Sequence, residues 1–239
     1  MIQLNESKSY SCLQDSFIMK SWKSVSLPEY TKKEEILNII THAAGLVISA
    51  CIFAYCLVPA IMSRDTIRIV CASLYLFGTT VMFVTSVIYH AVANPDRKKL
   101  LRVIDHCTVF FSVAGTVTGC VPVVYDRVGK SQAILMLLVA WLGVTSGLLL
   151  TFFLFEKTKA IRMCLYIGTA LVCAIVGAKA YTLLPIGAFL CFLIGSSSLL
   201  LGAVFLRVGK TKQYFHAVFH ICIDIGLAVY FVGISKYCF

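Results

Sequence analysis

The chain has 239 residues, of which 59% are hydrophobic and 13% are charged, with a formal net charge of +10 and a mean hydropathy of +0.89. These values exclude an ordinary soluble domain and indicate a helical protein that crosses a membrane several times. Cationic loops beside membrane helices account for the positive charge in such a protein. Because the sequence also lacks an RNA- or DNA-binding motif, we expect no nucleic-acid partner.

The N-terminal residues 1–30 are predicted to form a polar, mobile cytoplasmic extension, ahead of a single membrane domain over residues 31–239. Acidic residues such as Glu6 and Asp15 stand among its lysines. The extension therefore lacks the order of basic, apolar and small residues that a signal peptide has.

Seven apolar stretches follow, each near the length that crosses a bilayer. They run over about 36–59, 67–93, 101–124, 132–155, 160–180, 183–206 and 215–235. Short polar loops separate them, and the division between the fifth and sixth stretches depends on Tyr181–Pro185 alone. We predict an all-α integral membrane protein, a bundle of seven transmembrane helices.

The distribution of Lys and Arg predicts the orientation of this bundle. Of the 21 Lys and Arg residues, 15 lie on the side of the N-terminus and 6 on the other side. The six are Arg64, Arg68, Arg127, Lys130, Lys179 and Lys236. Because cytoplasmic loops carry the excess of positive charge, the N-terminus is expected in the cytoplasm and, after seven crossings, the C-terminus outside.

Polar and ionisable side chains of four stretches fall at the same cytoplasmic depth of the membrane. They are Glu35, Asn38 and His42 in the first stretch, Ser86 and His90 in the second, Asp105 and His106 in the third, and His216 and His220 in the seventh. Ionisable residues within membrane helices are costly and normally mark a functional site.

The histidines favour a zinc site. His216 and His220 are four residues apart on one helical face, with Asp224 one turn further along. Together with His90 they would supply three imidazoles and leave a fourth zinc position open, which is the catalytic pattern. Asp105 would then hold a water molecule and accept its proton.

Each of these residues also has a simpler interpretation. The histidines can pack between helices and form hydrogen bonds there. Asp105 can be a charge that the helix dipole favours at a helix N-terminus. Ser86, which would support the site by donating a hydrogen bond, can equally donate to the carbonyl one turn before it.

The order and spacing of these residues resemble the hemolysin III / progestin and adipoQ receptor family, over about residues 30–235. The pattern is Glu35-x2-Asn38-x3-His42, Ser86-x3-His90, Asp105 followed by Ala114–Thr116 (AGT), and His216-x3-His220. The short loops and compact length resemble the bacterial hemolysin III branch more than the animal receptors.

The resemblance implies a seven-helix fold with a zinc ion near the cytoplasmic membrane face. It further implies that His90, His216 and His220 bind the zinc, that Asp105 contacts it through water, that Ser86 supports the site, and that Glu35, Asn38 and His42 are structural or surround the ligands. The family belongs to a wider group of proposed membrane amide hydrolases that includes alkaline ceramidases.

Two features depart from the family pattern. Asp224 stands where an apolar residue is expected, and it either orients His220 or bonds across to another helix. The stretch Gly119–Pro122 lacks the usual Thr-Pro after AGT, which leaves the course of the third helix open.

Three functions remain open at this point for a multi-pass protein of the bacterial inner membrane or a plasma membrane. The first is a zinc-dependent hydrolase of a lipid amide or ester, with a membrane lipid as substrate. The second is a receptor or sensor in which the zinc is structural. The third is a cytolysin, as the bacterial family name says.

Overall fold

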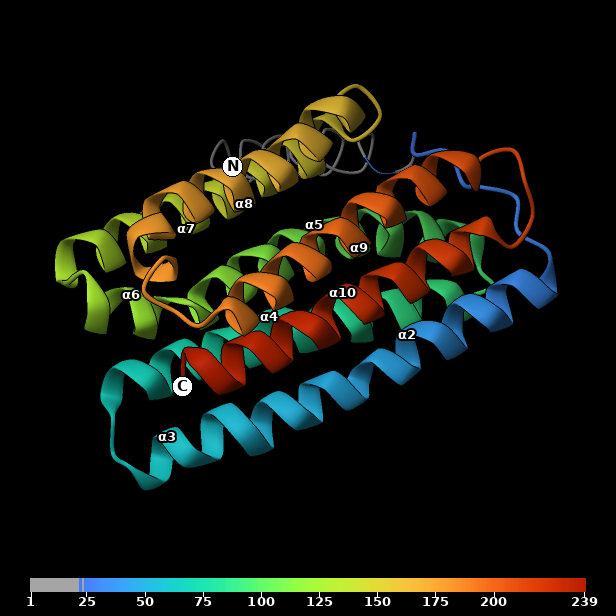
Figure 1. Ribbon diagram of the computed structural model, residues 1–239. Helices are drawn as coiled ribbons and strands as arrows, with labels where there is room; N and C mark the ends of the chain where they lie inside the picture. Colours follow the sequence, from blue (N-terminus) through green and yellow to red (C-terminus); the bar gives the residue numbers. More distant parts are fainter. Residues whose placement is uncertain (1–21, 23) are drawn as a thin grey trace, which may run out of the picture.

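The computed structural model describes residue 22 and residues 24–239, and within them the chain forms helices and turns without any strand (Figure 1). The elements are α2 (Lys32–Ile52), the π-helical turn η1 (Phe53–Leu57), α3 (Val58–Met62), α4 (Thr66–Ala91), α5 (Pro95–Gly119), α6 (Val121–Arg127), α7 (Lys130–Leu154), α8 (Lys159–Tyr181), α9 (Ile186–Val208) and α10 (Phe215–Tyr237). Most of the expected extension over residues 1–30 lies outside the described residues.

Within the part of the chain that the structure describes, seven helical spans are long and apolar enough to cross a membrane, which confirms the predicted bundle of seven transmembrane helices. The first span joins α2, η1 and α3 over Lys32–Met62, and the third joins α5 and α6 over Pro95–Arg127. The expected break between the fifth and sixth spans is present, because α8 ends at Tyr181 and α9 begins at Ile186. We call the end of the bundle where α2, α5 and α10 begin its N-terminal end.

Two helices at the N-terminal end begin earlier than the hydrophobic pattern predicts. The Thr31 hydroxyl accepts a hydrogen bond from the amide of Glu34, whose carboxylate in turn accepts from the Thr31 amide, so this capping box starts α2 before the apolar stretch. Asn94 caps α5, and Pro95 occupies its first turn, so most of the expected loop after the second stretch is helical.

The third span is interrupted at the stretch that departs from the family pattern. Helix α5 ends at Gly119 and α6 begins at Val121, with Cys120 between them. Pro122 lies in the first turn of α6, where a proline is tolerated because its nitrogen has no helical partner to lose. The interruption lies at the end of the bundle opposite the N-terminal end.

Helices α4 and α5 cross at two glycines. A Cβ atom added to Gly78 would overlap the backbone carbonyl of Phe111, and one added to Gly115 would lie 2.9 Å from the carbonyl oxygen of Leu74. Glycine at both positions therefore lets the two backbones touch, which is a common way to pack helices in membranes. A second close pair consists of α9 and α10, and α2 packs between α4 and α10.

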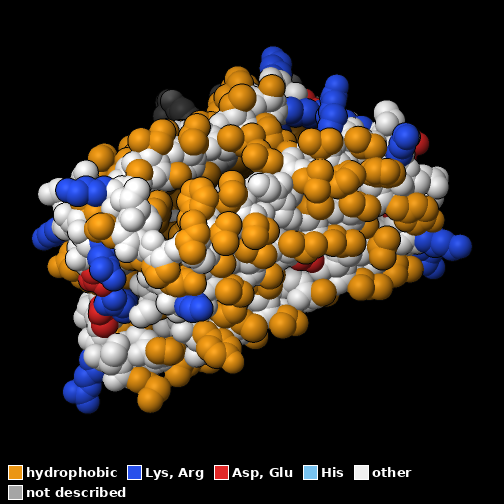
Figure 2. All heavy atoms as spheres, in the orientation of Figure 1, with side chains coloured by type: hydrophobic (Ala, Val, Ile, Leu, Met, Phe, Trp, Pro, Cys, Tyr) orange, Lys and Arg blue, Asp and Glu red, His pale blue; other side chains and the backbone are white. Residues whose placement is uncertain are grey.

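The surface of the bundle is apolar over its middle and cationic at its ends. Figure 2 shows hydrophobic side chains across the visible long face and Lys and Arg side chains gathered at the two ends. Exposed residues of this band include Leu138, Ile175 and Val204, each more than half exposed. Such a band fits the hydrocarbon of a bilayer, and the chain is a multi-pass integral membrane protein.

The visible face is hollowed beside α9, which packs mainly against α10 (Figures 1 and 2).

Candidate metal centre

Three histidines from two helices converge at the N-terminal end of the bundle. His90 is in the last turn of α4, and His216 and His220 are in the first two turns of α10. One ring nitrogen from each lies within 4.8 Å of the others. His90 and His220 are buried, with 3% and 2% of their surface exposed, whereas His216 is partly exposed. The structure thus brings together the three residues that the sequence predicts as metal ligands.

The hydrogen bonds of His90 determine which of its nitrogens is free. Its Nδ1 lies 2.6 Å from Oε2 of Glu35 and 3.4 Å from Nδ2 of Asn38. Because the carboxylate can only accept and lies much closer, Nδ1 carries the proton and donates it to Glu35. Nε2 is buried and has no hydrogen-bond partner among the described residues. Buried acceptors are normally paired, so the lone pair of this nitrogen is open to a ligand such as a metal ion or a water molecule.

Glu35 is itself held in place by Lys98. The Lys98 ammonium lies 2.9 Å from Oε1 of Glu35 and 3.1, 3.3 and 3.1 Å from the carbonyl oxygens of Tyr89, His90 and Val92, so its three N–H groups are shared among four acceptors. A lysine here satisfies carbonyls that the end of α4 leaves unpaired. The same ammonium therefore caps α4 and fixes the carboxylate that orients His90.

Thr41 contacts Nδ1 of His220, as Glu35 contacts Nδ1 of His90. The Thr41 hydroxyl donates to the backbone carbonyls of Leu37 and Asn38, each 3.0 Å away. Its oxygen lies 3.2 Å from Nδ1 of His220. When the single hydroxyl proton is donated to one of these carbonyls, the oxygen accepts from Nδ1–H, and that tautomer leaves Nε2 of His220 as an acceptor.

Tyr30 and the start of α10 position His216. The backbone amide of Tyr214, which precedes α10 with a positive φ of 65°, donates to Oε1 of Glu34 at 2.9 Å. This bond joins the starts of α10 and α2. The ring of Tyr30 stacks on His216 with 5.1 Å between centroids and an angle of 26°.

Asp105 and Ser86 lie beside the cluster and not within it. Asp105, in α5, accepts a hydrogen bond from the buried Ser86 hydroxyl and is close enough to His90 to interact electrostatically. Its carboxylate is not among the ligand atoms that lie within 4.8 Å of one another. The position suits a carboxylate that acts on a metal through a water molecule.

The remaining predicted residues surround the cluster. The buried ring of His42 lies 3.7 Å from that of His220 between centroids and packs on Phe83. Asp224, one turn beyond His220 in α10, has one buried carboxylate oxygen without a hydrogen-bond partner among the described residues. Since Thr41 takes the Nδ1 of His220, Asp224 does not orient that imidazole through this nitrogen.

Thr41, Lys98 and Tyr30 are the residues of the site that the sequence reasoning missed. Thr41 lies one turn from Asn38 and Leu37 and next to His42, so the stripe of polar residues on the first helix was the signal that could have found it. Lys98 and Tyr30 belong to segments read as a loop and an extension, where spacing carries no information on contacts.

The three histidines fit a zinc ion. Zinc prefers nitrogen ligands, and its histidine ligands normally donate their other N–H to a carboxylate or another oxygen. His90 and His220 both show this arrangement, with Glu35 and Thr41 as the acceptors. The buried, unpaired Nε2 of His90 is where such an ion would bind.

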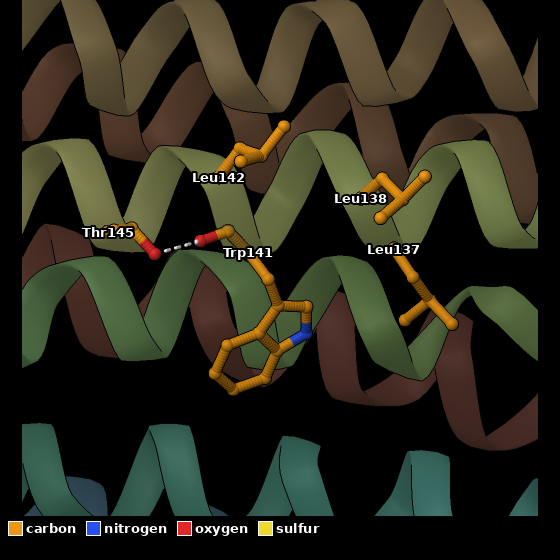
Figure 3. Close-up of a pocket in the computed structure, with 5 residues that line it drawn as sticks. All are labelled: Leu137, Leu138, Trp141, Leu142 and Thr145. Atoms are coloured by element: carbon orange, nitrogen blue, oxygen red, sulfur yellow. Dashed lines mark hydrogen bonds between the residues drawn. The ribbon is translucent and has the colours of Figure 1, made fainter.

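A separate depression on α7 is not lined by histidines or carboxylates. It has a volume of about 300 Å³ and is lined by Leu137, Leu138, Trp141, Leu142 and Thr145 (Figure 3). The Thr145 hydroxyl donates to the Trp141 carbonyl in its own helix, and the indole N–H of Trp141 donates to the Thr118 hydroxyl. The depression contains no ionisable group and is an ordinary lipid-facing surface.

Comparisons with known proteins agree with the motifs. A family model described as haemolysin-III related matches residues 30–231. The chain is 22% identical over 209 residues to the hemolysin-3 homolog of Bacillus subtilis (strain 168), covering 87% of this chain and 96% of that protein. It is 25% identical over 207 residues to hemolysin-3 of Bacillus cereus, covering 86% and 92%. It is also 24% identical over 219 residues to the human monocyte to macrophage differentiation factor, covering 85% and 84%. The resemblance predicted from the sequence is confirmed, and the chain belongs to the haemolysin-III related family.

Proposed function

We propose that the protein is a zinc-dependent hydrolase that cleaves an amide or ester bond of a membrane lipid. The observation that carries the proposal is the buried, unpaired Nε2 of His90 beside His216 and His220. Three imidazoles with this geometry are a metal-binding set that leaves room for a further ligand. Zinc in such a site supplies Lewis-acid activation of a water molecule.

Asp105 and Ser86 have the chemistry that hydrolysis requires of the protein. The Asp105 carboxylate, beside the cluster, is the group to accept a proton at its oxygen and later return it to the leaving group. Ser86 donates a hydrogen bond to that carboxylate and holds it toward the histidines. Glu35 and Thr41 fix the orientation of His90 and His220 throughout.

The shape of the bundle supports a lipid substrate. The middle of the surface is apolar, and the face beside α9 is hollowed at the depth of the hydrocarbon (Figure 2). An acyl chain can lie along such a surface while its polar bond reaches the N-terminal end of the bundle. The charge distribution supports a cytoplasmic location for that end in the bacterial inner membrane or a plasma membrane.

A sensor with a structural zinc is the alternative. It is favoured by the contacts of Nδ1 of His90 with Glu35 and of Nδ1 of His220 with Thr41, and by the stacking of Tyr30 on His216, because oriented ligands are also typical of a structural site. In a sensor, the ion would join α4 to α10 and ligand binding would shift the helices.

The test measures zinc content and lipid hydrolysis together. Wild-type protein and the His90→Ala variant are purified in detergent and incubated with ceramides and other long-chain lipid amides and esters. We expect about one zinc per wild-type chain, turnover of at least one lipid class, and loss of both in the variant. Full zinc content without turnover of any lipid would favour the sensor, and zinc retained by His90→Ala would overturn the metal site.

A further inference from the structure

Residues 24–30 form a segment without regular secondary structure, here called the N-terminal strap, that lies on the N-terminal end of the bundle before α2 begins. Val25 attaches it, because this side chain is only 1% exposed and packs with Val103, Cys107 and Phe155. Removal of an apolar side chain from water to this extent stabilises the attachment. The strap is therefore packed as part of the bundle.

A second attachment is polar and joins the strap to the turn between α7 and α8. The backbone amide and the hydroxyl of Ser26 both lie 3.0 Å from Oε1 of Glu156. The guanidinium of Arg102 donates to the Ser26 carbonyl. Burial alone would raise the pKa of Glu156, but the hydrogen bonds from Lys159 and Ser26 lower it below its ordinary value. The carboxylate thus stays ionised and accepts these bonds at neutral pH.

The strap ends at Tyr30, whose ring covers the candidate metal centre. Its centroid lies 5.1 Å from that of His216 and 5.9 Å from that of His90. His216 is the partly exposed member of the cluster, and the ring of Tyr30 covers one face of its imidazole.

We propose that the N-terminal strap closes the metal centre against water at its own end of the bundle, with the Tyr30 ring as the closing group. A substrate that reaches the centre then comes from the bilayer, which restricts the substrate class to amphiphiles dissolved in the membrane and excludes soluble amides and esters. This inference rests on the proposed function, since it needs a metal bound by the three histidines.

Two chelators separate the two routes to the metal. Zinc-loaded full-length protein in lipid nanodiscs is treated with EDTA, which does not enter hydrocarbon, or with 1,10-phenanthroline, which does, and zinc release is followed over time. For the wild type we expect slow release to EDTA and faster release to phenanthroline. In Tyr30→Ala the release to EDTA should rise by about tenfold or more, because the local opening that exposes His216 is no longer needed. The release to phenanthroline should change less than about twofold.

Further variants test which part of Tyr30 matters and guard against misfolding. Tyr30→Phe keeps the ring and should behave as the wild type, whereas a fast release in this variant would show that the ring does not close the site. Val25→Asp places a charge in the apolar pocket and should release the strap without altering Tyr30, again speeding release to EDTA alone. Tyr125→Ala, at the opposite end of the third span, is the matched control and should leave both rates unchanged.

The outcomes separate the two proposals. Zinc that is present in the wild type but leaves Tyr30→Ala and Val25→Asp no faster than the wild type would overturn the strap proposal and leave the metal centre intact. Wild-type protein without zinc would overturn the proposed function itself.

Discussion

The Thr41 hydroxyl oxygen lies 3.2 Å from Nδ1 of His220, although the two residues are 179 positions apart in the chain. The contact joins α2 to α10 and decides which nitrogen of His220 can bind a metal. Glu35, one and a half turns earlier in α2, does the same for His90 of α4. A single helix that contributes none of the three histidines therefore orients imidazoles on both of its neighbours.

Thr41→Val should weaken zinc binding while the fold persists. Valine has nearly the shape of threonine but no acceptor, so Nδ1–H of His220 loses its partner and the imidazole its fixed tautomer. Loss of such an oxygen acceptor typically lowers metal affinity by about 10–100-fold. Zinc affinity is measured by competition with a chelator of known strength. Thr145→Val on α7, whose hydroxyl donates only to its own helix, serves as the control, and an equal loss of affinity in both variants would contradict the assignment.

His216→Ala or His220→Ala should remove the metal and lower the melting temperature, because the ion would join α10 to α4. Metal analysis and thermal unfolding in detergent measure both effects. Wild-type protein stripped of metal should melt at the temperature of the variants. A double variant that retains full zinc would disprove ligation by α10.

Asp105→Asn distinguishes a catalyst from a structural site. The carboxamide is almost the same size and can still accept a hydrogen bond from Ser86, but it cannot accept a proton. We expect zinc content and melting temperature to stay near the wild-type values while hydrolysis falls by roughly 10²–10⁴-fold. Undiminished hydrolysis would remove Asp105 from the mechanism. A loss of zinc and stability instead would indicate that it anchors a structural water.

Reporters at the two ends of the chain test the orientation. A reporter fused before Met1 should be inside and one fused after Phe239 outside, because 15 of the 21 Lys and Arg residues lie on the side of the N-terminus. Enzymatic reporters that are active on only one side of the membrane give the reading. Both reporters on one side would mean that one of the seven spans does not cross.

Gly78→Ala should destabilise the bundle by about 1–3 kcal/mol, the usual cost of overpacking. The added methyl group would meet the backbone carbonyl of Phe111, which cannot move aside as a flexible side chain can. Gly168→Ala in α8 is the matched control, since an added Cβ meets nothing within 4 Å there. It should be neutral or stabilise by up to about 1 kcal/mol, as alanine favours a helix more than glycine does. Unfolding by denaturant or heat compares the two variants, and equal stabilities would mean that the crossing has room.

Long apolar stretches made the seven helices predictable from the sequence, because the bilayer requires about 20 apolar residues at each crossing. The three histidines were predictable because ionisable groups are rare in hydrocarbon and each stands out in its helix. The polar stripe of Glu35, Asn38 and His42 on the first stretch was predictable as the surroundings of these histidines, but the individual bonds were not. Thr41 has an ordinary local role in its own helix, and its bond to His220 exists only because α2 and α10 pack at one particular register. Tyr30 precedes α2 in a segment without regular secondary structure. Such a segment has no hydrophobic periodicity from which its contact with His216 could be predicted.

The crossing of α4 and α5 at Gly78 and Gly115 also acts at a distance. Ser86 lies eight residues beyond Gly78 along α4, about 12 Å, and Asp105 lies ten residues before Gly115 along α5, about 15 Å. The two glycines therefore fix the crossing angle of two long helical segments, and the Ser86–Asp105 hydrogen bond joins these segments far from the crossing. A change of a few degrees in the crossing angle displaces Ser86 and Asp105 by a large fraction of an ångström. Gly78 and Gly115, which lie far from the histidine cluster, thus determine how the Asp105 carboxylate is aligned with the Ser86 hydroxyl.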